Sequence, residues 1–321
     1  MEAIEVSPFT GVTLQNLYVE DLHQDTLAYV ESLNVDVKEF SIKEKRIFVD
    51  EVNIDNVYFN LKKYKQDSIV NLRFILNHYK KTDTLKEPSS WKFGLDKVSV
   101  TNGRFDFNNE DSSPVIAGVD YKHIGISNLN FKTNSVQFIP DGVNCNIEEL
   151  SFFEQSGFEL EDLKTEFNIS PKGIIGQHLK LMTPNSNVGG DVILITNSYK
   201  DLSKFIDNVQ IQSYFENTEV SFKDLCFFAP KLNCLNKKVT LTGEIKGRIS
   251  NLKGRKLLIV TDDGTSFKGK ASISGLPDVE NMFMHINVNE LITSKQQLDR
   301  LPLFPFCDNK KLKLTSNFNH L

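Results

Sequence analysis

The sequence predicts a mostly β protein, built as an elongated, curled antiparallel sheet that forms a U-shaped trough or solenoid-like groove. Strand-like alternation of apolar and polar residues dominates the chain of 321 residues. Turn signals rich in Gly, Pro, Asn and Asp interrupt the alternation at short intervals, which excludes an alternating βαβ chain whose crossovers need about a dozen residues each. The third observation is a repeated shift in the alternation.

The shift is clear in GVTLQNLYVED (11–21), where apolar residues fall on even positions before Asn16 and on odd positions after it. Successive strand residues point to opposite faces, so such a shift turns the apolar set over unless an extra residue makes a bulge or bend. Asn and Asp suit that place because they tolerate left-handed backbone and bond nearby backbone groups. Each unit therefore predicts two short strands that meet at a bend and share one apolar face. Chance is the alternative, since Asn is abundant in this chain.

The same pattern recurs along the chain and would curl a long sheet, because open sheets rarely exceed about ten strands without curling. Its joins are Asn56, Asn128, Glu149 and Asp224, with weaker copies at Asp162 and Asn251 and a lengthened variant at Asn102.

Two or three short helices are expected between the strands. They cover 65–81, with Asp67 or Ser68 as N-cap, 198–206, and 289–302, which Pro302 ends. The expected organisation is an N-terminal β module over 1–80 that ends in the first helix, a polar linker over 81–90, and continuing β repeats over 91–321. KLKLTSNFNHL (311–321) alternates as a strand without a partner, so the chain is expected to be a fragment truncated at its C-terminus.

Composition and motifs argue against several classes of function. The net charge is −5 and the basic residues are scattered, so the electrostatic footprint of a nucleic-acid protein is missing. The chain has no GxSxG, HExxH, P-loop or GxGxxG motif. The sequence thus predicts no enzyme, no metal and no cofactor, although a pair of carboxylates in a cleft, as in a glycosidase, stays open.

Individual residues of chemical interest have ordinary interpretations. His23 with Asp21 and Asp25 is expected to form a solvated turn rather than a cation site. DDGT at 262 reads as a type I′ hairpin turn, and NVGG at 187 as another turn. The cysteines are Cys145, Cys226, Cys234 and Cys307; buried free thiols are expected, with a Cys226–Cys234 bridge as the alternative. The start of the chain has neither a signal peptide nor an apolar run of about 18 residues, so the chain is expected to be soluble.

The remaining hypothesis concerns an apolar surface. If the sheet closes imperfectly, its apolar residues line a long groove, and large apolar concavities bind apolar partners. A filled β-solenoid core is the alternative. The groove candidates are Leu14, Val35, Val37, Ile54, Phe59, Ile126, Phe131 and Phe222.

Residues 11–61 resemble the N-terminal module of the TamB and AsmA-like proteins in the form found in Bacteroidetes. The resemblance is carried by the D-x-x-x-DTL turn from Asp21 to Leu27, the strand SLNVDV, and the pair marked by Val52, Ile54, Val57 and Phe59. KYKQDSIVNLRFILN (63–77) is similar to the family's bridging segment. The match is close over 11–80 and continues as a pattern to about residue 300.

The resemblance implies a periplasmic protein of the translocation and assembly module type, which carries phospholipid in a U-shaped, apolar β-trough towards the outer membrane. It also implies a barrel partner in outer-membrane protein assembly. Family members usually begin with a transmembrane anchor, which this chain lacks. The expected function is therefore non-enzymatic carriage or shielding of phospholipid acyl chains, and the alternative is a structural or adhesive β-solenoid that binds protein or glycan on its outside.

Overall fold

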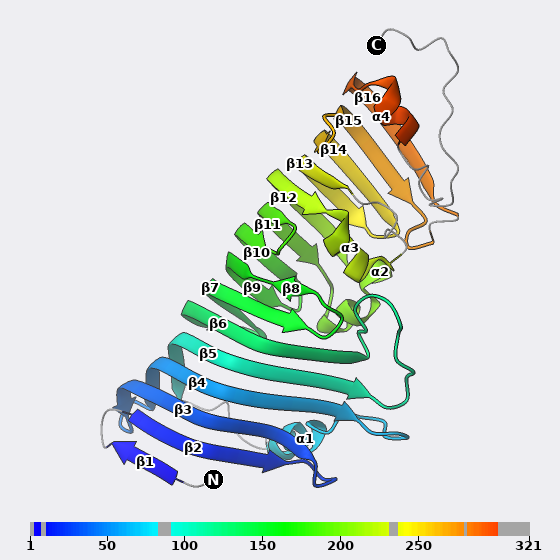
Figure 1. Cartoon of the computed structure of the whole chain (residues 1–321). Coiled ribbons are helices and arrows are strands. Elements are labelled where there is room, and N and C mark those ends of the chain that lie inside the picture. The colour runs from blue at the N-terminus through cyan, green and yellow to red at the C-terminus, as the bar shows by residue number, and fades with distance from the viewer. Residues whose placement is uncertain (1–2, 8–10, 83–90, 231–236, 279–280, 301–321) are drawn as a thin grey trace. The chain divides into compact units, whose positions relative to one another are not determined.

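The computed structural model describes residues 3–7, 11–82, 91–230, 237–278 and 281–300, and it is mostly β, with 66% strand (Figure 1). The chain divides into two compact units, each described by itself: unit 1 holds 1–139 and 144–163, and unit 2 holds 140–143 and 164–321. The described strands follow one another in a linear order, and the first and last of them are not paired. The mostly β class is therefore confirmed, whereas the trough stays part of the proposal below.

The strands of unit 1 lie side by side in the order of the sequence. They are β1 (Ala3–Ser7), β2 (Gly11–Glu20), β3 (Thr26–Ser41), β4 (Arg46–Lys63), β5 (Lys92–Asn109), β6 (His123–Ile139) and β7 (Gly142–Glu154), with β8 (Glu159–Leu160) paired to β7. The expectation of antiparallel pairing is wrong at one place, because β4 and β5 are parallel. The segment 64–91, which includes α1 (Arg73–Thr82), is long enough to return the chain to the start of β4.

The first expected helix exists but begins later than predicted, at Arg73 rather than after Asp67 or Ser68. Asp67 lies too far before Arg73 to cap the helix, and its carboxylate lies 3.3 Å from Nε2 of His23 instead. The helix also runs past the predicted linker boundary at residue 81, and the rest of that linker, 83–90, lies outside the described residues.

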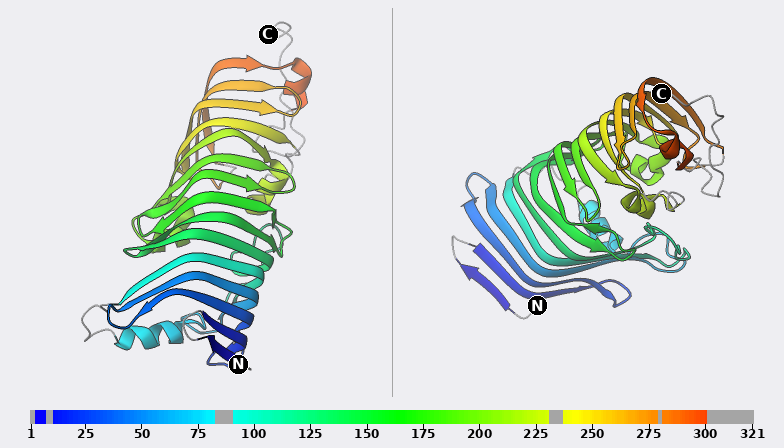
Figure 2. Two further views of the ribbon diagram at one scale, coloured as in Figure 1. Left: turned by 90° about the vertical axis from the view of Figure 1, so that its left-hand side faces the viewer. Right: turned by 45° about the horizontal axis from the view of Figure 1, so that its top comes forward.

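Unit 2 continues with strands that also pair with their sequence neighbours (Figure 2). They are β9 (Asp162–Ser170), β10 (Gly173–Met182), β11 (Asn187–Ile195), β12 (Gln210–Ser221), β13 (Lys238–Arg248), β14 (Asn251–Thr261), β15 (Ser266–Ser274) and β16 (Phe283–Ile292). The helices are η2 (Tyr199–Lys204), α2 (Phe205–Asn208), α3 (Phe222–Phe228) and α4 (Lys295–Arg300). The helix expected over 198–206 is present as η2 followed by α2, and the one expected over 289–302 is present in shorter form as α4, because its first residues belong to β16. Pro302 and the strand-like end 311–321 lie outside the described residues.

The expected bend at Asp224 is wrong, because this stretch forms α3. Ser221 caps the helix by accepting a hydrogen bond from the backbone N–H of Lys223. The Asp224 carboxylate is buried and accepts hydrogen bonds from Thr183 Oγ1 at 2.6 Å and from Asn185 Nδ2 at 2.9 Å. The helix is therefore held by residues far away in the sequence, and Phe222 does not belong to the sheet.

The bends predicted at Asn residues are confirmed in unit 1. Asn16, Asn56, Asn102 and Asn128 lie inside strands with φ of 51°, 51°, 52° and 51°. This is the left-handed region, which costs Asn less than most other residues. Each of these residues takes up the one-residue shift, so that the apolar residues before and after it stay on one face.

Other predicted joins differ. Glu149 lies within β7 without a left-handed φ, and Asp162 and Asn251 begin strands. Left-handed residues that the pattern missed occur at Ser135, His178, Asn217 and Lys256.

Two turn predictions need correction. DDGT does connect β14 and β15, but of these residues only Gly264 has a positive φ, of 88°, so the turn is not type I′. NVGG is no turn, because it opens β11, with Gly190 at a register shift opposite Phe215.

Few apolar side chains are buried. Among the described residues these are Leu27, Val30, Cys145, Ile147, Leu160, Val209 and Leu257. Most other apolar strand residues are half-buried, because the described strands belong to a single sheet with no second sheet packed on it. None of the helices in the described ranges is long and apolar enough to cross a membrane.

Candidate apolar groove

A continuous apolar row crosses the strands of unit 1. Leu14 lies opposite Leu33, Leu33 opposite Ile54, Ile54 opposite Val100, and Val100 opposite Phe131. Directly opposed residues share one face of a sheet. Register thus brings the predicted groove residues Leu14, Ile54 and Phe131 into one row.

Neighbouring rows hold the other candidates of unit 1. Val35 lies opposite Val12 and Val52, and Val37 opposite Val49. Phe59 and Ile126 both lie opposite Phe105, and the rings of Phe59 and Phe105 are 6.2 Å apart. All of these side chains are half-buried, whereas Phe222 lies in α3 and joins none of the rows.

A ladder of polar side chains runs along the bend that separates these rows. Asn56 Nδ2 donates to Glu31 Oε2 at 2.7 Å, and Asn102 Nδ2 donates to Asn56 Oδ1 at 2.5 Å. The backbone N–H of Asn102 donates to Asn130 Oδ1 at 3.2 Å. The bends of adjacent strands are therefore tied to one another by their side chains, and this aligns the apolar rows.

Unit 2 contains an apolar hollow of about 390 Å³ over β13 to β16. Register explains it, because Leu241 lies opposite Ile259, and Ile259 opposite Phe267. Such an apolar concavity on an uncovered sheet is suited to hydrocarbon. The lining residues are Leu241, Ile245, Leu252, Gly254, Leu257, Ile259, Phe267, Ala271, Ile273, Met284 and Ile286.

None of the predicted groove residues lines this hollow. The alternation in KVTLTGEI (238–245) and MHINVN (284–289) was available as a signal. Alternation shows that a strand has an apolar face but not whether other elements cover that face. The hollow could therefore not be located from the sequence.

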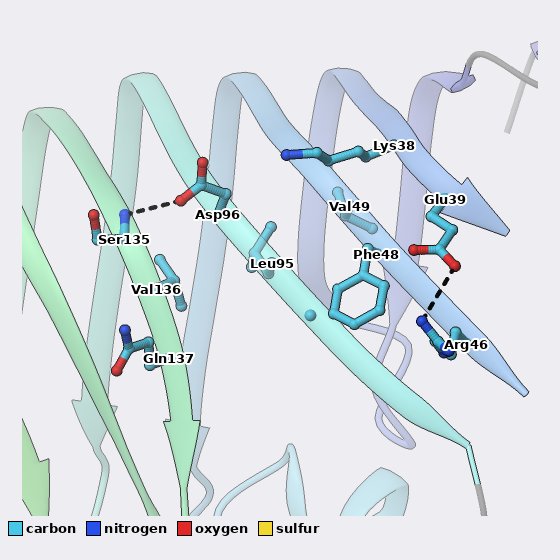
Figure 3. Close-up of a pocket in the computed structure, with 11 residues that line it drawn as sticks. Lys38, Glu39, Arg46, Phe48, Val49, Leu95, Asp96, Ser135, Val136 and Gln137 are labelled. Atoms are coloured by element: carbon cyan, nitrogen blue, oxygen red, sulfur yellow. Dashed lines mark hydrogen bonds and ion pairs between the residues drawn. The ribbon is translucent and has the colours of Figure 1, made fainter.

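A second cavity, of about 810 Å³, lies in unit 1 near the turn between β3 and β4 (Figure 3). Its lining is mixed. Phe48, Val49, Leu95 and Val136 supply apolar surface, and Lys38, Arg46, Glu39 and Asp96 supply charge. Arg46 lies 3.7 Å from Glu39, and Asp96 Oδ1 accepts a hydrogen bond from the backbone N–H of Ser135 at 3.2 Å.

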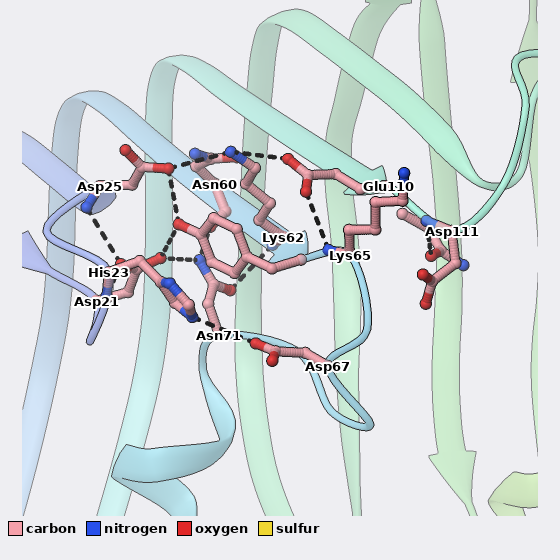
Figure 4. Close-up of polar contacts among 12 residues, drawn as sticks. Asp21, His23, Asp25, Asn60, Lys62, Lys65, Asp67, Asn71, Glu110 and Asp111 are labelled. Atoms are coloured by element: carbon pink, nitrogen blue, oxygen red, sulfur yellow. Dashed lines mark hydrogen bonds and ion pairs between the residues drawn. The ribbon is translucent and has the colours of Figure 1, made fainter.

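The D-x-x-x-DTL turn was expected to be a solvated turn. Instead its side chains form a hydrogen-bonded cluster, here called the polar clasp (Figure 4). Asp21 is buried and accepts hydrogen bonds from the backbone N–H groups of His23 at 2.8 Å and Asp25 at 3.1 Å. The Tyr64 hydroxyl lies 2.7 Å from a carboxylate oxygen of both Asp21 and Asp25. Asn71 Nδ2 also donates to Asp21, at 2.9 Å.

Electrostatics holds the clasp in its ionised form. Burial opposes ionisation of Asp21, but the hydrogen bonds from Asn71, Tyr64 and the backbone outweigh it and lower its pKa. The hydrogen bond from Tyr64 and the Lys62 ammonium, 3.1 Å away, lower the pKa of Asp25. Burial and both carboxylates raise the pKa of Tyr64, so the phenol stays protonated. The carboxylates are therefore occupied as structural acceptors.

The next features are the possible metal ligands and the cysteines of the described residues. No group of three or more His, Cys, Asp or Glu side chains in the described ranges is placed to hold a metal ion. Cys145 is free and buried, as expected, and Cys226 is free and half-buried in α3; Cys234 and Cys307 lie outside the described residues. The sites that stand out are thus apolar.

Comparison with known proteins does not assign the chain. No family model matches it. A search of curated proteins finds no match either. The resemblance to TamB and AsmA-like proteins stays a prediction, based on the DTL turn and the bent strand pairs.

Proposed function

We propose that this protein is a non-enzymatic carrier that shields phospholipid acyl chains on an apolar sheet face. The observation that carries the proposal is the apolar hollow of about 390 Å³ on β13 to β16, on a sheet whose apolar side chains are mostly only half-buried. A U-shaped trough would join such surfaces into one path. By resemblance, the path runs through the periplasm between inner and outer membrane, with an outer-membrane barrel as assembly partner.

The physical basis is the cost of wet apolar surface. Each Å² of apolar surface removed from water contributes about 25 cal/mol, and each buried methylene about 0.8 kcal/mol. When a hydrocarbon tail occupies the hollow, apolar surface of both the tail and the protein is removed from water, and this stabilises the complex. A polar ligand would gain nothing there, because Leu252, Ile259 and Phe267 present only carbon atoms.

The test is mass spectrometry of lipids retained by the purified protein. Ile286→Asp puts a charge on the face of the hollow, and the matched control Phe283→Asp puts the same charge on the opposite face of β16. Both positions are exposed, at 48% and 67%, so both variants are expected to fold. We expect the first variant to retain at least about tenfold less phospholipid, because an unpaired charge in an apolar site costs several kcal/mol, and the second to retain the wild-type amount.

Two results would overturn the proposal. Wild-type protein without bound phospholipid, even after incubation with vesicles, would favour the structural or adhesive solenoid. Equal loss in both variants would show that retention does not depend on the hollow.

A further inference from the structure

The end of unit 1 at the β3–β4 turn carries large exposed aromatic side chains. Phe40 lies opposite Ile47, and Ile47 opposite Phe93, so these three share a row. Phe40 is 62% exposed, Phe93 61%, and Phe138 at the same end of β6 58%. Ile42, in the turn, is 71% exposed. Exposed aromatic side chains in such a group mark an interaction surface.

Basic side chains accompany these aromatics. Lys43 and Lys45 lie in the turn, and Lys92 begins β5, where its backbone N–H donates to the Lys45 carbonyl at 2.8 Å. All three are exposed, and their ammonium groups form no ion pair with any described residue.

Four of the acids at this end, Glu39, Glu44, Asp50 and Asp96, have partners other than these lysines. Glu39 and Glu44 both pair with Arg46, and Asp50 lies 4.0 Å from Lys97. Asp96 accepts the backbone hydrogen bond described above. Three exposed lysines beside the aromatic side chains therefore remain without an acidic partner among the described residues.

The opposite end of unit 1 provides a contrast. Its loops expose Leu22, Val115 and Ile116, but the latter two belong to a loop that also carries the acids Glu110 and Asp111. Lys62 and Lys63 pair with those acids, at 3.2 and 2.7 Å. The opposite end also exposes one aromatic ring, Tyr121, at 60%, beside Lys122. The β3–β4 end differs in that three exposed phenylalanines gather there with three exposed lysines.

We propose that this end, the aromatic rim formed by Phe40, Ile42, Phe93 and Phe138 with Lys43, Lys45 and Lys92, binds the surface of an anionic phospholipid bilayer. Aromatic rings are suited to the interface between headgroups and tails, and lysines near the surface are attracted to anionic lipids. Along β5, the lining residues Leu95 and Asp96 of the mixed cavity come between Phe93 of the rim and Val100 of the central apolar row. Bilayer docking goes beyond lipid carriage and does not require it.

The test is flotation of lipid-stripped protein with vesicles of phosphatidylglycerol and phosphatidylcholine, or of phosphatidylcholine alone. The aromatic variant is Phe40→Ser with Phe93→Ser, and the charge variant is Lys43→Glu with Lys45→Glu. The matched controls, at the opposite end, are Ile116→Ser, at a fully exposed residue, and Lys122→Glu, at another lysine without an ion pair in the described chain.

We expect the wild type and both controls to bind the anionic vesicles, and high salt to weaken this binding. Binding of the aromatic variant to the anionic vesicles should be at least about tenfold weaker than that of the wild type. Binding of the charge variant should be weaker by about fivefold for each lysine removed. The lysines are surface residues, so the charge variant keeps the test valid if the aromatic variant fails to fold.

Absence of vesicle binding by the wild type would overturn the proposal and favour a protein partner for the rim. Equal binding by the charge variant and the wild type would also overturn it. Lipid retention by the same variants separates the two proposals, because a docking defect leaves the hollow in unit 2 intact.

Discussion

The side-chain amide of Asn102 donates a hydrogen bond to the side-chain oxygen of Asn56, 2.5 Å away, across the parallel pair β4–β5. Both residues have left-handed backbone, with φ of 52° and 51°. Asn therefore has two roles here. It tolerates the left-handed backbone of the bend, and its side-chain amide links the bend to the one on the neighbouring strand. Glu31 extends the ladder on one side and Asn130 on the other.

This relationship predicts that Asn56→Val destabilises the protein by about 2–4 kcal/mol. A left-handed conformation costs a non-Gly residue about 1–2 kcal/mol, and each lost hydrogen bond about 0.5–1.5 kcal/mol. Chemical denaturation measures the free energy of unfolding. The matched control is Asn53→Val in the same strand, where φ is not left-handed and Val suits the strand, so stability should change by no more than about 0.5 kcal/mol. Equal effects of the two substitutions would contradict the role of the bend.

The polar clasp predicts a pH-dependent effect of Tyr64→Phe. At neutral pH the variant should lose about 1–3 kcal/mol of stability, because the carboxylates of Asp21 and Asp25 lose a hydrogen-bond donor. Both carboxyl pKa values are lowered in the folded state from the usual 3.8. Their stabilisation is therefore present above about pH 4 and is lost as the pH falls through the lowered values, so the difference between variant and wild type should shrink below pH 4.

The control for this prediction is Tyr18→Phe. The Tyr18 hydroxyl makes an exposed, neutral contact with Thr26 Oγ1 at 3.2 Å, so its loss should change stability by less than about 0.5 kcal/mol at any pH. Thermal unfolding from pH 7 to pH 3 compares the two variants. A Tyr64→Phe effect that stays constant with pH would argue against ionised partners.

The bends show which features follow from local sequence and which do not. Asn16, Asn56, Asn102 and Asn128 were predictable because Asn itself favours the left-handed backbone. His178 has no such preference. It lies in the register shift between Gly176 and Leu179 of β10, and its backbone N–H donates to Asp191 Oδ1 on β11 at 2.9 Å. Partners on the next strand are not visible in a local pattern.

The same reasoning applies to α3 and to the hollow. FKDLCFF has apolar residues both at strand spacing and at helix spacing, so the pattern does not distinguish the two. The helix is stabilised by the buried carboxylate of Asp224, which accepts hydrogen bonds from Thr183 and Asn185. The alternation of β13 to β16 was readable, but the uncovered face depends on which elements pack against the sheet. The mostly β class was thus predictable from sequence, and the location of the hollow was not.

Gly190 allows a test of a bend that the sequence pattern missed. Its φ is 137°, and a Cβ there would lie 2.0 Å from the carbonyl oxygen of Tyr214. Gly190→Ala should therefore cost about 1–3 kcal/mol. Its neighbour Gly189 has no left-handed φ, and its nearest atom would be 3.4 Å from a new Cβ, so Gly189→Ala should leave stability unchanged or raise it by about 0.4–1 kcal/mol. Urea denaturation of both variants checks the prediction, and similar stabilities would contradict it.

The apolar rows of unit 1 lead to the last prediction, which concerns Ile54→Asp. Ile54 lies between Leu33 and Val100 in the central row, so a carboxylate there meets hydrocarbon on both sides. If the rows of unit 1 belong to the lipid path, the folded variant should retain several-fold less phospholipid than the wild type, since an unpaired charge in an apolar path costs several kcal/mol. Asn53→Asp places the same charge on the opposite face of β4 and should retain the wild-type amount. Circular dichroism establishes that each variant is folded, and lipid mass spectrometry measures retention. Normal retention by folded Ile54→Asp would restrict the path to the hollow of unit 2.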